Sequence, residues 1–348
     1  MHRSRRDFLR NTFIGAGLAS SGKAWAAGAK KAAIDPPTKA PYHVEHGWPV
    51  TPQEFMFGQV SGVGIDSNNQ VVVFHRADHS YGRARTPIRV PTILSFDGES
   101  GRQTGSWGAN MFVKPHGLRV DQHDNVWVTD IWLQQVFKFT RDGKLLMSVG
   151  VKGVKGLDDR HFNRPTDVAV APDGSFYVSD GYGNSRVAKF SPQGKFLFDW
   201  GRKGDKPGEF NTPHNVALDA SGRVYVADRT NKRIQVFDEN GKFLHLWKSE
   251  ELGRPWALTM GADGNLYVVD GGDGSPWPPN RGHVMRVDIA NGNVLEKWSR
   301  FGKYDGEIYW GHDVAVGKDL AVYVGDVGYG MRIQKFARSA KKCLCLRT

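Results

Sequence analysis

The segment PHGLRVDQHDNVWVTDI, residues 115–131, is one of six similar segments in this chain. An apolar run leads into a polar turn and a second apolar run that ends in aspartate, which is typical of two antiparallel strands. The other copies align without gaps, and they begin at Val60, Pro165, Pro213, Pro255 and Gly311. Repetition at intervals of 42–56 residues indicates a fold made of repeated supersecondary units.

Two further strands follow most of the six segments. RVAKFSPQGKFLFDWG (residues 186–201) and RIQVFDENGKFLHLWK (residues 233–248) each read as two strands around a hairpin turn. A tryptophan recurs where the last strand ends, at positions 107, 200, 247 and 298. Four antiparallel strands per unit predict an all-β fold, a six-bladed β-propeller formed by residues 58–337.

The two ends of the propeller region are predicted to meet in the last blade. The sequence after Phe336 offers a poor fourth strand, and residues 338–348 read as a basic C-terminal tail. A segment within residues 27–57, most plausibly between Tyr42 and Phe57, is therefore expected to complete the last blade and close the ring.

Residues 1–26 resemble a twin-arginine export signal. Arg5 and Arg6 precede a short, weakly apolar stretch, and Ala24-Trp25-Ala26 is a candidate cleavage site. The alternative is a basic N-terminal helix. No apolar run reaches the roughly 18–20 residues of a membrane span, so we expect an exported protein, periplasmic or secreted, without a span.

Charge and cysteine content exclude some classes of protein. The formal charge is +11, but lysines and arginines are scattered over turns, so no nucleic-acid partner is predicted. A basic surface instead favours a small anionic substrate. The two cysteines, Cys343 and Cys345, are too close for a disulfide that staples a fold, and their spacing is not that of a zinc site.

The second residue of each repeat, here called position two, predicts a metal centre. In a propeller the first strand of each blade lines the central channel, so equivalent positions lie at one height. Position two is histidine in alternate blades, at His116, His214 and His312. Three converging imidazoles with an open fourth position are typical of catalytic zinc sites, although iron, copper and nickel also accept imidazole.

Cationic and phenolic side chains are expected near the same channel mouth. Arg76 and Arg229 directly follow the second strand in opposite blades, one and four. Arginine binds carboxylates through two parallel hydrogen bonds. Tyr182, in blade three, is a candidate general base, because a phenol ionises more readily beside a metal ion and a guanidinium. The residues thus predict metal-assisted chemistry on an anionic substrate.

Several motifs resemble the peptidyl-α-hydroxyglycine α-amidating lyase family. They are VSGVGID (residues 60–66), FHRADH (74–79), SDGYGNSR (179–186), PHNVALD (213–219) and GHDVAV (311–316). The resemblance runs from about Val60 to Phe336. It implies a six-bladed propeller of NHL repeats that cleaves a C-terminal α-hydroxyglycine into a peptide amide and glyoxylate.

The resemblance also implies roles for particular residues. His116, His214 and His312 would bind zinc, and Tyr182 would be the base with Arg76 beside it. Arg229 would be a second active-site cation, and Asp313 would complete the polar shell. The family's structural calcium would be held by the backbone carbonyls of Val63 and Leu118.

Two other functions are compatible with the sequence. One is a non-catalytic NHL propeller that binds a protein or a glycan, although such a scaffold needs no metal site. The other is a metal-dependent hydrolase or lyase acting on another small anion such as ureidoglycolate. Lactonases of similar shape centre on acidic and asparagine ligands, whereas this channel carries histidines. We expect a monomer.

Overall fold

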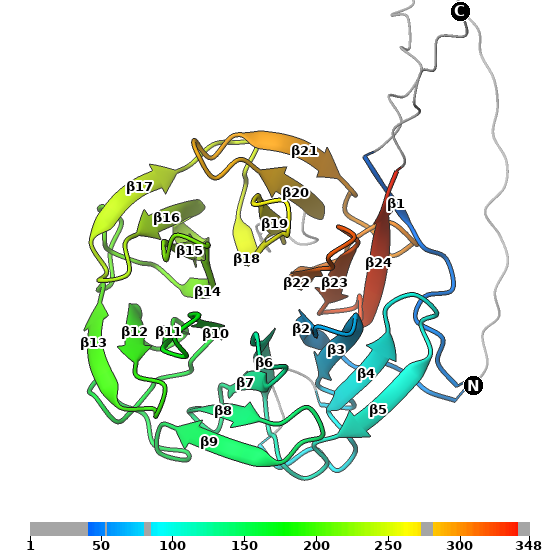
Figure 1. The fold of residues 1–348 in the computed structure, drawn as a ribbon, viewed down its shortest axis with the longest axis horizontal. Helices are drawn as coiled ribbons and strands as arrows, with labels where there is room; N and C mark the ends of the chain where they lie inside the picture. The colour runs from blue at the N-terminus through cyan, green and yellow to red at the C-terminus, as the bar shows by residue number, and fades with distance from the viewer. Residues whose placement is uncertain (1–40, 53, 80–84, 273–280, 340–348) are drawn as a thin grey trace, which may run out of the picture. The chain divides into compact units, whose positions relative to one another are not determined.

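A computed structural model describes residues 41–52, 54–79, 85–272 and 281–339. Their strands form six four-stranded antiparallel sheets arranged around a central channel (Figure 1), so the chain is an all-β, six-bladed β-propeller. The predicted export signal (1–26) and Cys343 and Cys345 lie outside the described residues. No helix among those described is long and apolar enough to cross a membrane.

Each blade begins with its inner strand, at the channel, and ends with its outer strand. The strands of blades one to three are β2 Val60–Ile65, β3 Gln70–His75, β4 Ile93–Asp97, β5 Gln103–Trp107, β6 Pro115–Val120, β7 Val126–Asp130, β8 Gln135–Phe139, β9 Leu145–Val149, β10 Asp167–Val170, β11 Phe176–Asp180, β12 Arg186–Phe190 and β13 Phe196–Trp200. Those of blades four to six are β14 Pro213–Leu218, β15 Val224–Asp228, β16 Arg233–Phe237, β17 Phe243–Trp247, β18 Pro255–Met260, β19 Leu266–Asp270, β20 His283–Val287, β21 Val294–Trp298, β22 Gly311–Val316, β23 Val322–Asp326 and β24 Arg332–Arg338, together with β1 Tyr42–Val44. A short 3-10 turn, η1 Arg229–Asn231, follows β15.

The N-terminal strand closes the ring. β1 pairs antiparallel with β24, the last strand of the chain, and so becomes the outer strand of blade six. Tyr42 of β1 stacks on Trp298 of blade five, with ring centroids 4.1 Å apart and planes 19° from parallel. The closing strand is therefore held both by backbone pairing and by an aromatic contact with the neighbouring blade.

The hydrophobic core is divided among the interfaces between blades. Each of the six clusters of buried apolar residues combines side chains from two neighbouring blades, such as Val72 and Phe74 of blade one with Val126 and Val128 of blade two. Both faces of each inner and second strand are buried, which explains their nearly continuous apolar sequence.

The recurring tryptophans pack against hairpin glycines of the next blade. A Cβ on Gly143, which has a φ of +90°, would lie 2.7 Å from the Trp107 ring. Gly241, with a φ of +79°, is covered in the same way by Trp200. Only glycine suits both the left-handed backbone and the close ring, so this pair links the outer edges of successive blades.

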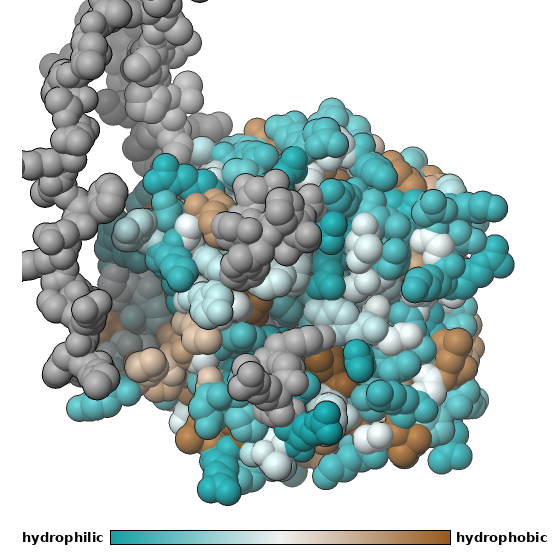
Figure 2. Space-filling model, turned by 180° about the vertical axis from the view of Figure 1, so that it is seen from behind, coloured by the Kyte–Doolittle hydropathy of each residue, from teal (hydrophilic) through white to brown (hydrophobic). Residues whose placement is uncertain are grey.

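The surface is mostly polar where Figure 2 shows it. On that face hydrophobic side chains are scattered among hydrophilic ones rather than joined in one patch. Scattered apolar residues are normal for a protein surface and do not by themselves mark a docking face.

Candidate metal centre

The three histidines of position two lie in β-bulges of their inner strands. In β14 the pairing register shifts between Pro213 and Asn215, which leaves His214 out of the ladder. The same shift skips His312 in β22, and in β6 it skips His116 together with Gly117. A bulge redirects a side chain that regular pairing would hold between the blades. The imidazoles can therefore project into the channel.

The aspartates that end the second strands fix the backbone that leads to each histidine. Their buried carboxylates accept hydrogen bonds from amides two or three residues before position two. These contacts are Asp130 with Val113 and Lys114 (2.7 and 2.9 Å), Asp228 with Asn211 (2.7 Å), and Asp326 with Tyr309 and Trp310 (2.8 and 2.5 Å). The recurring aspartate thus anchors the entry to each inner strand.

Backbone carbonyls of the intervening blades orient the imidazoles. Nδ1 of His116 lies 2.6 Å from the carbonyl oxygen of Thr166, at position two of the next blade. His214 bonds in the same way to Trp256 (2.6 Å), and His312 to Ser61 (2.8 Å). A carbonyl can only accept, so each Nδ1 carries the proton and each Nε2 keeps its lone pair. Blades two, four and six thus supply the imidazoles, and blades three, five and one supply the carbonyls that orient them.

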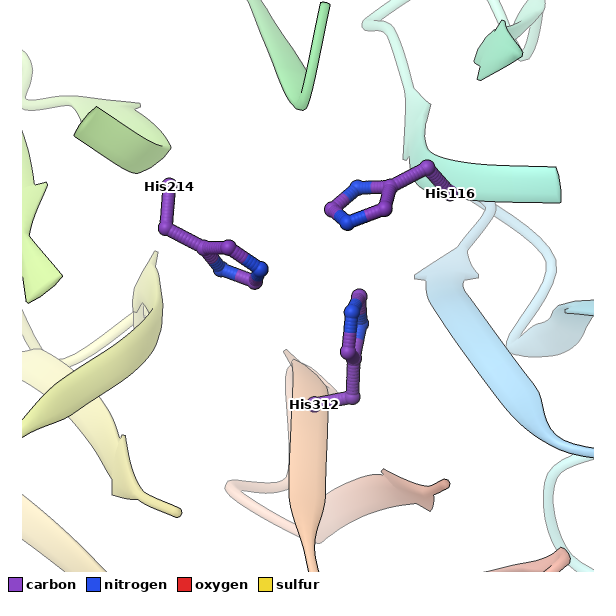
Figure 3. Close-up of side chains that lie close together, drawn as sticks. All are labelled: His116, His214 and His312. Atoms are coloured by element: carbon purple, nitrogen blue, oxygen red, sulfur yellow. The ribbon is translucent and has the colours of Figure 1, made fainter. Parts of the chain in front are cut away.

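The imidazoles converge as a metal site requires. Figure 3 shows the three rings projecting from separate strands toward one point, and one ligand atom from each lies within 4.8 Å of the others. Burial, followed by the positive charge of Arg76, holds the pKa of His116 well below its usual value. Burial likewise lowers the pKa of His214 and His312, so all three are neutral near pH 7.

A buried nitrogen in this cluster has no hydrogen-bond partner in the part of the chain that the structure describes. Nε2 of His116 is inaccessible to solvent and makes no hydrogen bond with the described residues. A buried, unpaired imidazole nitrogen is costly unless something binds it. Together with the fixed tautomers, this orphaned lone pair means that the residues present fit a metal ion held by three imidazoles.

Tyr182 and Arg229 join the triad as the sequence predicted. The Tyr182 hydroxyl lies 3.0 Å from Nε2 of His214, and Nη1 of Arg229 donates to the hydroxyl oxygen over 3.2 Å. The Arg229 guanidinium also lies over the Trp256 ring, 4.1 Å from its centroid. The phenol of Tyr182 therefore contacts both the imidazole of His214 and the guanidinium of Arg229.

Arg76 reaches the same place from blade one. Its Nε donates to the carbonyl of Pro115 (3.0 Å) and its Nη1 to Oε1 of Gln59 (2.6 Å). A cavity of about 250 Å³ lies at this end of the channel, lined by Gln59, Arg76, Tyr182, Arg229, Trp256, Trp310, His312, Val327 and Gly328. Two arginines and a phenol supply polar groups to its lining, and tryptophan and valine supply apolar surface.

Asp313, Val63 and Leu118 belong to a different part of the channel. The Asp313 carboxylate accepts from the Val63 amide (2.9 Å) and from Nη1 of Arg119 (3.0 and 3.1 Å). It is not among the described residues that line the cavity. The Leu118 carbonyl accepts from the same Nη1 over 2.9 Å. Of the two predicted calcium ligands, the Leu118 carbonyl thus contacts a guanidinium, and Val63 reaches the same carboxylate through its amide.

Sequence reasoning did not assign Gln59, Trp256 or Trp310 to the site. Trp256 occupies position two of blade five, so its place in the repeat could have signalled that it faces the channel. Gln59 and Trp310 directly precede the repeat in blades one and six, a position at the same channel mouth. Their residue types differ, however, and no shared chemistry marks them in the sequence.

Comparisons with known proteins agree with this architecture. The NHL repeat model matches residues 162–190 and 210–237. Peptidyl-alpha-hydroxyglycine alpha-amidating lyase 2 of Drosophila melanogaster is 32% identical over 308 residues, which cover 81% of this chain and 71% of the fly protein. Peptidyl-glycine alpha-amidating monooxygenase B of Xenopus laevis is 38% identical over 307 residues, 81% of this chain. That alignment covers 34% of the frog protein, so this chain spans about a third of its length.

A solved structure shares the fold. The gluconolactonase of Xanthomonas campestris superimposes with a TM-score of 0.58 over 86% of this chain and 95% of its own, at 13% identity. At that identity the likeness concerns the propeller architecture alone.

Proposed function

Because the chain belongs to the peptidyl-α-hydroxyglycine α-amidating lyase family, we propose that it is a metal-dependent lyase for a peptidyl-α-hydroxyglycine-like carbinolamide. The reaction breaks the bond between the hydroxylated carbon and the amide nitrogen, and it yields an amide and glyoxylate. The observation that carries the proposal is the meeting of three oriented histidines with Tyr182 and Arg229 at one cavity.

His116, His214 and His312 would hold the metal, which we propose to be zinc, through their Nε2 atoms. Three imidazoles leave a coordination position open, as catalytic zinc sites do. A zinc ion there would supply Lewis acidity for the substrate hydroxyl. The carbonyls of Thr166, Trp256 and Ser61 keep the rings from turning away when a substrate enters.

Tyr182 would accept the hydroxyl proton. Its oxygen lies beside His214 and receives a hydrogen bond from Arg229, so the phenol is held between the proposed metal ligands and a cation of the cavity. When the hydroxyl oxygen forms the carbonyl bond of glyoxylate, the carbon–nitrogen bond breaks and the amide nitrogen takes up a proton. Return of that proton from the phenol balances the reaction, and no other reactant is needed.

The arginines would bind the substrate carboxylate. Nε of Arg229 is buried and has no hydrogen-bond partner among the described residues, so it is a donor ready for an anion. Trp256 holds the guanidinium plane by stacking. Trp310 and Val327, on the apolar side of the cavity, would contact the acyl group of the amide.

Metal analysis combined with a glyoxylate-release assay on α-hydroxyhippurate tests the proposal. The purified protein should contain about one zinc ion per chain, and His214→Ala should lose both metal and turnover. His245→Ala, an exposed histidine in β17, is the matched control and should keep both. Activity in a metal-free protein or in His214→Ala would overturn the metal mechanism. Turnover of ureidoglycolate without turnover of α-hydroxyhippurate would overturn the substrate class.

Export is part of the same proposal. Residues 1–26, which carry Arg5 and Arg6, would direct the folded protein through the twin-arginine route to the periplasm or the medium. Replacing both arginines with lysine should retain the protein in the cytoplasmic fraction of a bacterial host. An unchanged distribution between fractions would contradict this route.

A further inference from the structure

One long side chain occupies a layer of the channel that is otherwise lined by small residues. At the fifth position of the repeat, blade two has Arg119, and the equivalent residues are Gly64, Ala169, Ala217, Thr259 and Ala315. A Cβ on Gly64 would already lie 2.6 Å from the Leu118 side chain. Ala169, Ala217 and Thr259 line one hollow together with Arg119, so a guanidinium fits at this level.

The Arg119 guanidinium joins four of the six blades. Nη1 donates to the carbonyl of Leu118 in its own blade (2.9 Å) and to Asp313 in blade six (3.0 and 3.1 Å). Nη2 donates to Asp167 in blade three (2.8 Å) and to the carbonyl of Leu258 in blade five (3.2 Å). These contacts are called the Arg119 cluster below.

The oxygen atoms of this cluster resemble those of a cation site, but an arginine side chain takes the place of the metal ion. The side chains of Asp167 and Asp313 are 1% and 2% exposed, and that of Arg119 is 14% exposed. Calcium takes six to eight oxygen ligands at about 2.3–2.6 Å. Here two carboxylates and two carbonyls already receive hydrogen bonds from a fixed positive charge, and of the four carboxylate oxygens only Oδ1 of Asp167 has no partner among the described residues, which is too few for calcium. The residues present therefore do not fit a calcium ion beside Arg119.

The Arg119 cluster also reaches the strands that carry all three histidines. Arg119 and His116 belong to β6, and Asp313 directly follows His312 in β22. Asp167 accepts from the amide of Val216, two residues after His214 in β14 (3.2 Å). The Arg119 cluster is thus connected to each histidine by a short length of backbone.

We propose that Arg119 is the built-in cation of this propeller channel: it takes the place of the calcium ion expected at Leu118 and Val63, and it positions the histidine triad. The first part stands without the proposed lyase activity. The positioning part rests on the proposed metal centre. Loss of the guanidinium leaves two buried carboxylates facing each other, a site that calcium can then fill.

The response of thermal stability to calcium tests the first part with the full chain. The melting temperature of the wild-type protein should be the same in EGTA and in millimolar CaCl₂. Arg119→Ala should melt roughly 5–10 °C lower in EGTA. Added CaCl₂, but not MgCl₂, should restore most of this difference, and calorimetric titration should show one calcium site in the variant and none in the wild type.

Two further variants keep the test decisive. Arg223→Ala removes a guanidinium that pairs with Asp219 outside the cluster and should gain no calcium response. Arg119→Lys keeps one charge, should fold, and should remain indifferent to calcium. A wild-type protein that loses stability in EGTA and regains it with calcium overturns the proposal even if Arg119→Ala does not fold. So does a folded Arg119→Ala with no calcium response.

The positioning role has a spectroscopic readout. With Co²⁺ in the triad, Arg119→Ala should show altered visible absorption bands, and calcium should return them toward the wild-type spectrum. Arg119→Lys should lie between the two. An unchanged cobalt spectrum in Arg119→Ala overturns the positioning role. Failure of the wild-type protein to bind cobalt or zinc overturns the metal centre instead and leaves the calcium test standing.

Discussion

The hydroxyl of Tyr182 lies 3.0 Å from Nε2 of His214, the same nitrogen that faces the other two imidazoles. Because Nδ1 of His214 carries its proton toward the Trp256 carbonyl, Nε2 holds the lone pair and the phenol donates to it. One lone pair serves either the phenol or a metal. Metal binding at this nitrogen would therefore require the phenol to give up the hydrogen bond, which would leave its oxygen with Arg229 and the substrate.

The Tyr182→Phe variant tests the proposed base while all three proposed metal ligands stay in place. Turnover should fall by about 10²–10⁴, because proton abstraction loses its acceptor. Zinc affinity should be equal to or higher than in the wild type, because the competing hydrogen bond is gone. Steady-state kinetics and a competitive chelator titration measure the two quantities. Wild-type turnover in the variant would show that another group is the base.

Arg229→Ala should weaken recognition of the carboxylate. Charged hydrogen bonds are worth about 1.5–3 kcal/mol, so kcat/KM for α-hydroxyhippurate should fall by roughly 10–100-fold. Arg229→Lys should recover part of this loss, since it keeps the charge but not the planar stacking on Trp256. Equal kcat/KM in wild type and Arg229→Ala would place carboxylate binding elsewhere.

His75 should make the fold sensitive to mild acid. Burial lowers its pKa to about 4 in the folded protein, from 6.5. Its Nδ1 accepts from the amides of Gly58 and Ala77, and its Nε2 donates to the Pro91 carbonyl over 3.1 Å. The folded state thus favours the neutral ring. This contribution is complete above pH 6.5 and decreases as the pH falls toward 4, by roughly 3 kcal/mol at most.

Urea unfolding of the wild type and of His75→Gln at pH 7.5 and pH 5 isolates this contribution. The triad histidines titrate in both proteins, so their contribution cancels in the difference between the two. The wild type should lose more unfolding free energy than His75→Gln on acidification. Parallel losses in the two proteins would assign the acid sensitivity to other groups.

Tyr42→Ala should loosen the closure of the ring. The Tyr42 side chain is buried, stacks on Trp298 and bonds to the Tyr267 hydroxyl over 3.2 Å. Its truncation should cost roughly 3–5 kcal/mol of unfolding free energy. Tyr42→Phe keeps the stacked ring and should cost about 1 kcal/mol. Chemical denaturation measures both, and an unchanged midpoint in Tyr42→Ala would mean that β1 is not needed for closure.

The repeat pattern predicted most of the fold and the convergence of three histidines from local sequence. Strand alternation and hairpin turns are properties of short segments, so the number of blades and strands could be read directly. Position two has the same height in every blade, so histidines in alternate blades had to converge. The lyase motifs containing Arg76 and Tyr182 likewise indicated residues that the structure brings to the same cavity.

Other features depend on how the blades meet. Every residue has a carbonyl, so nothing in the sequence marks those of Thr166, Trp256 and Ser61 as the groups that orient the imidazoles. Asp313 was expected to complete the polar shell of the site, but its side chain turns to Arg119, whose partners come from blades distant in sequence. The sequence by itself determined the blades, the inner strands and the histidine triad, because these follow from a periodic local pattern. Only the tertiary structure decided the ring tautomers, the cavity and the channel cation, because these arise from contacts between blades that no repeat position encodes.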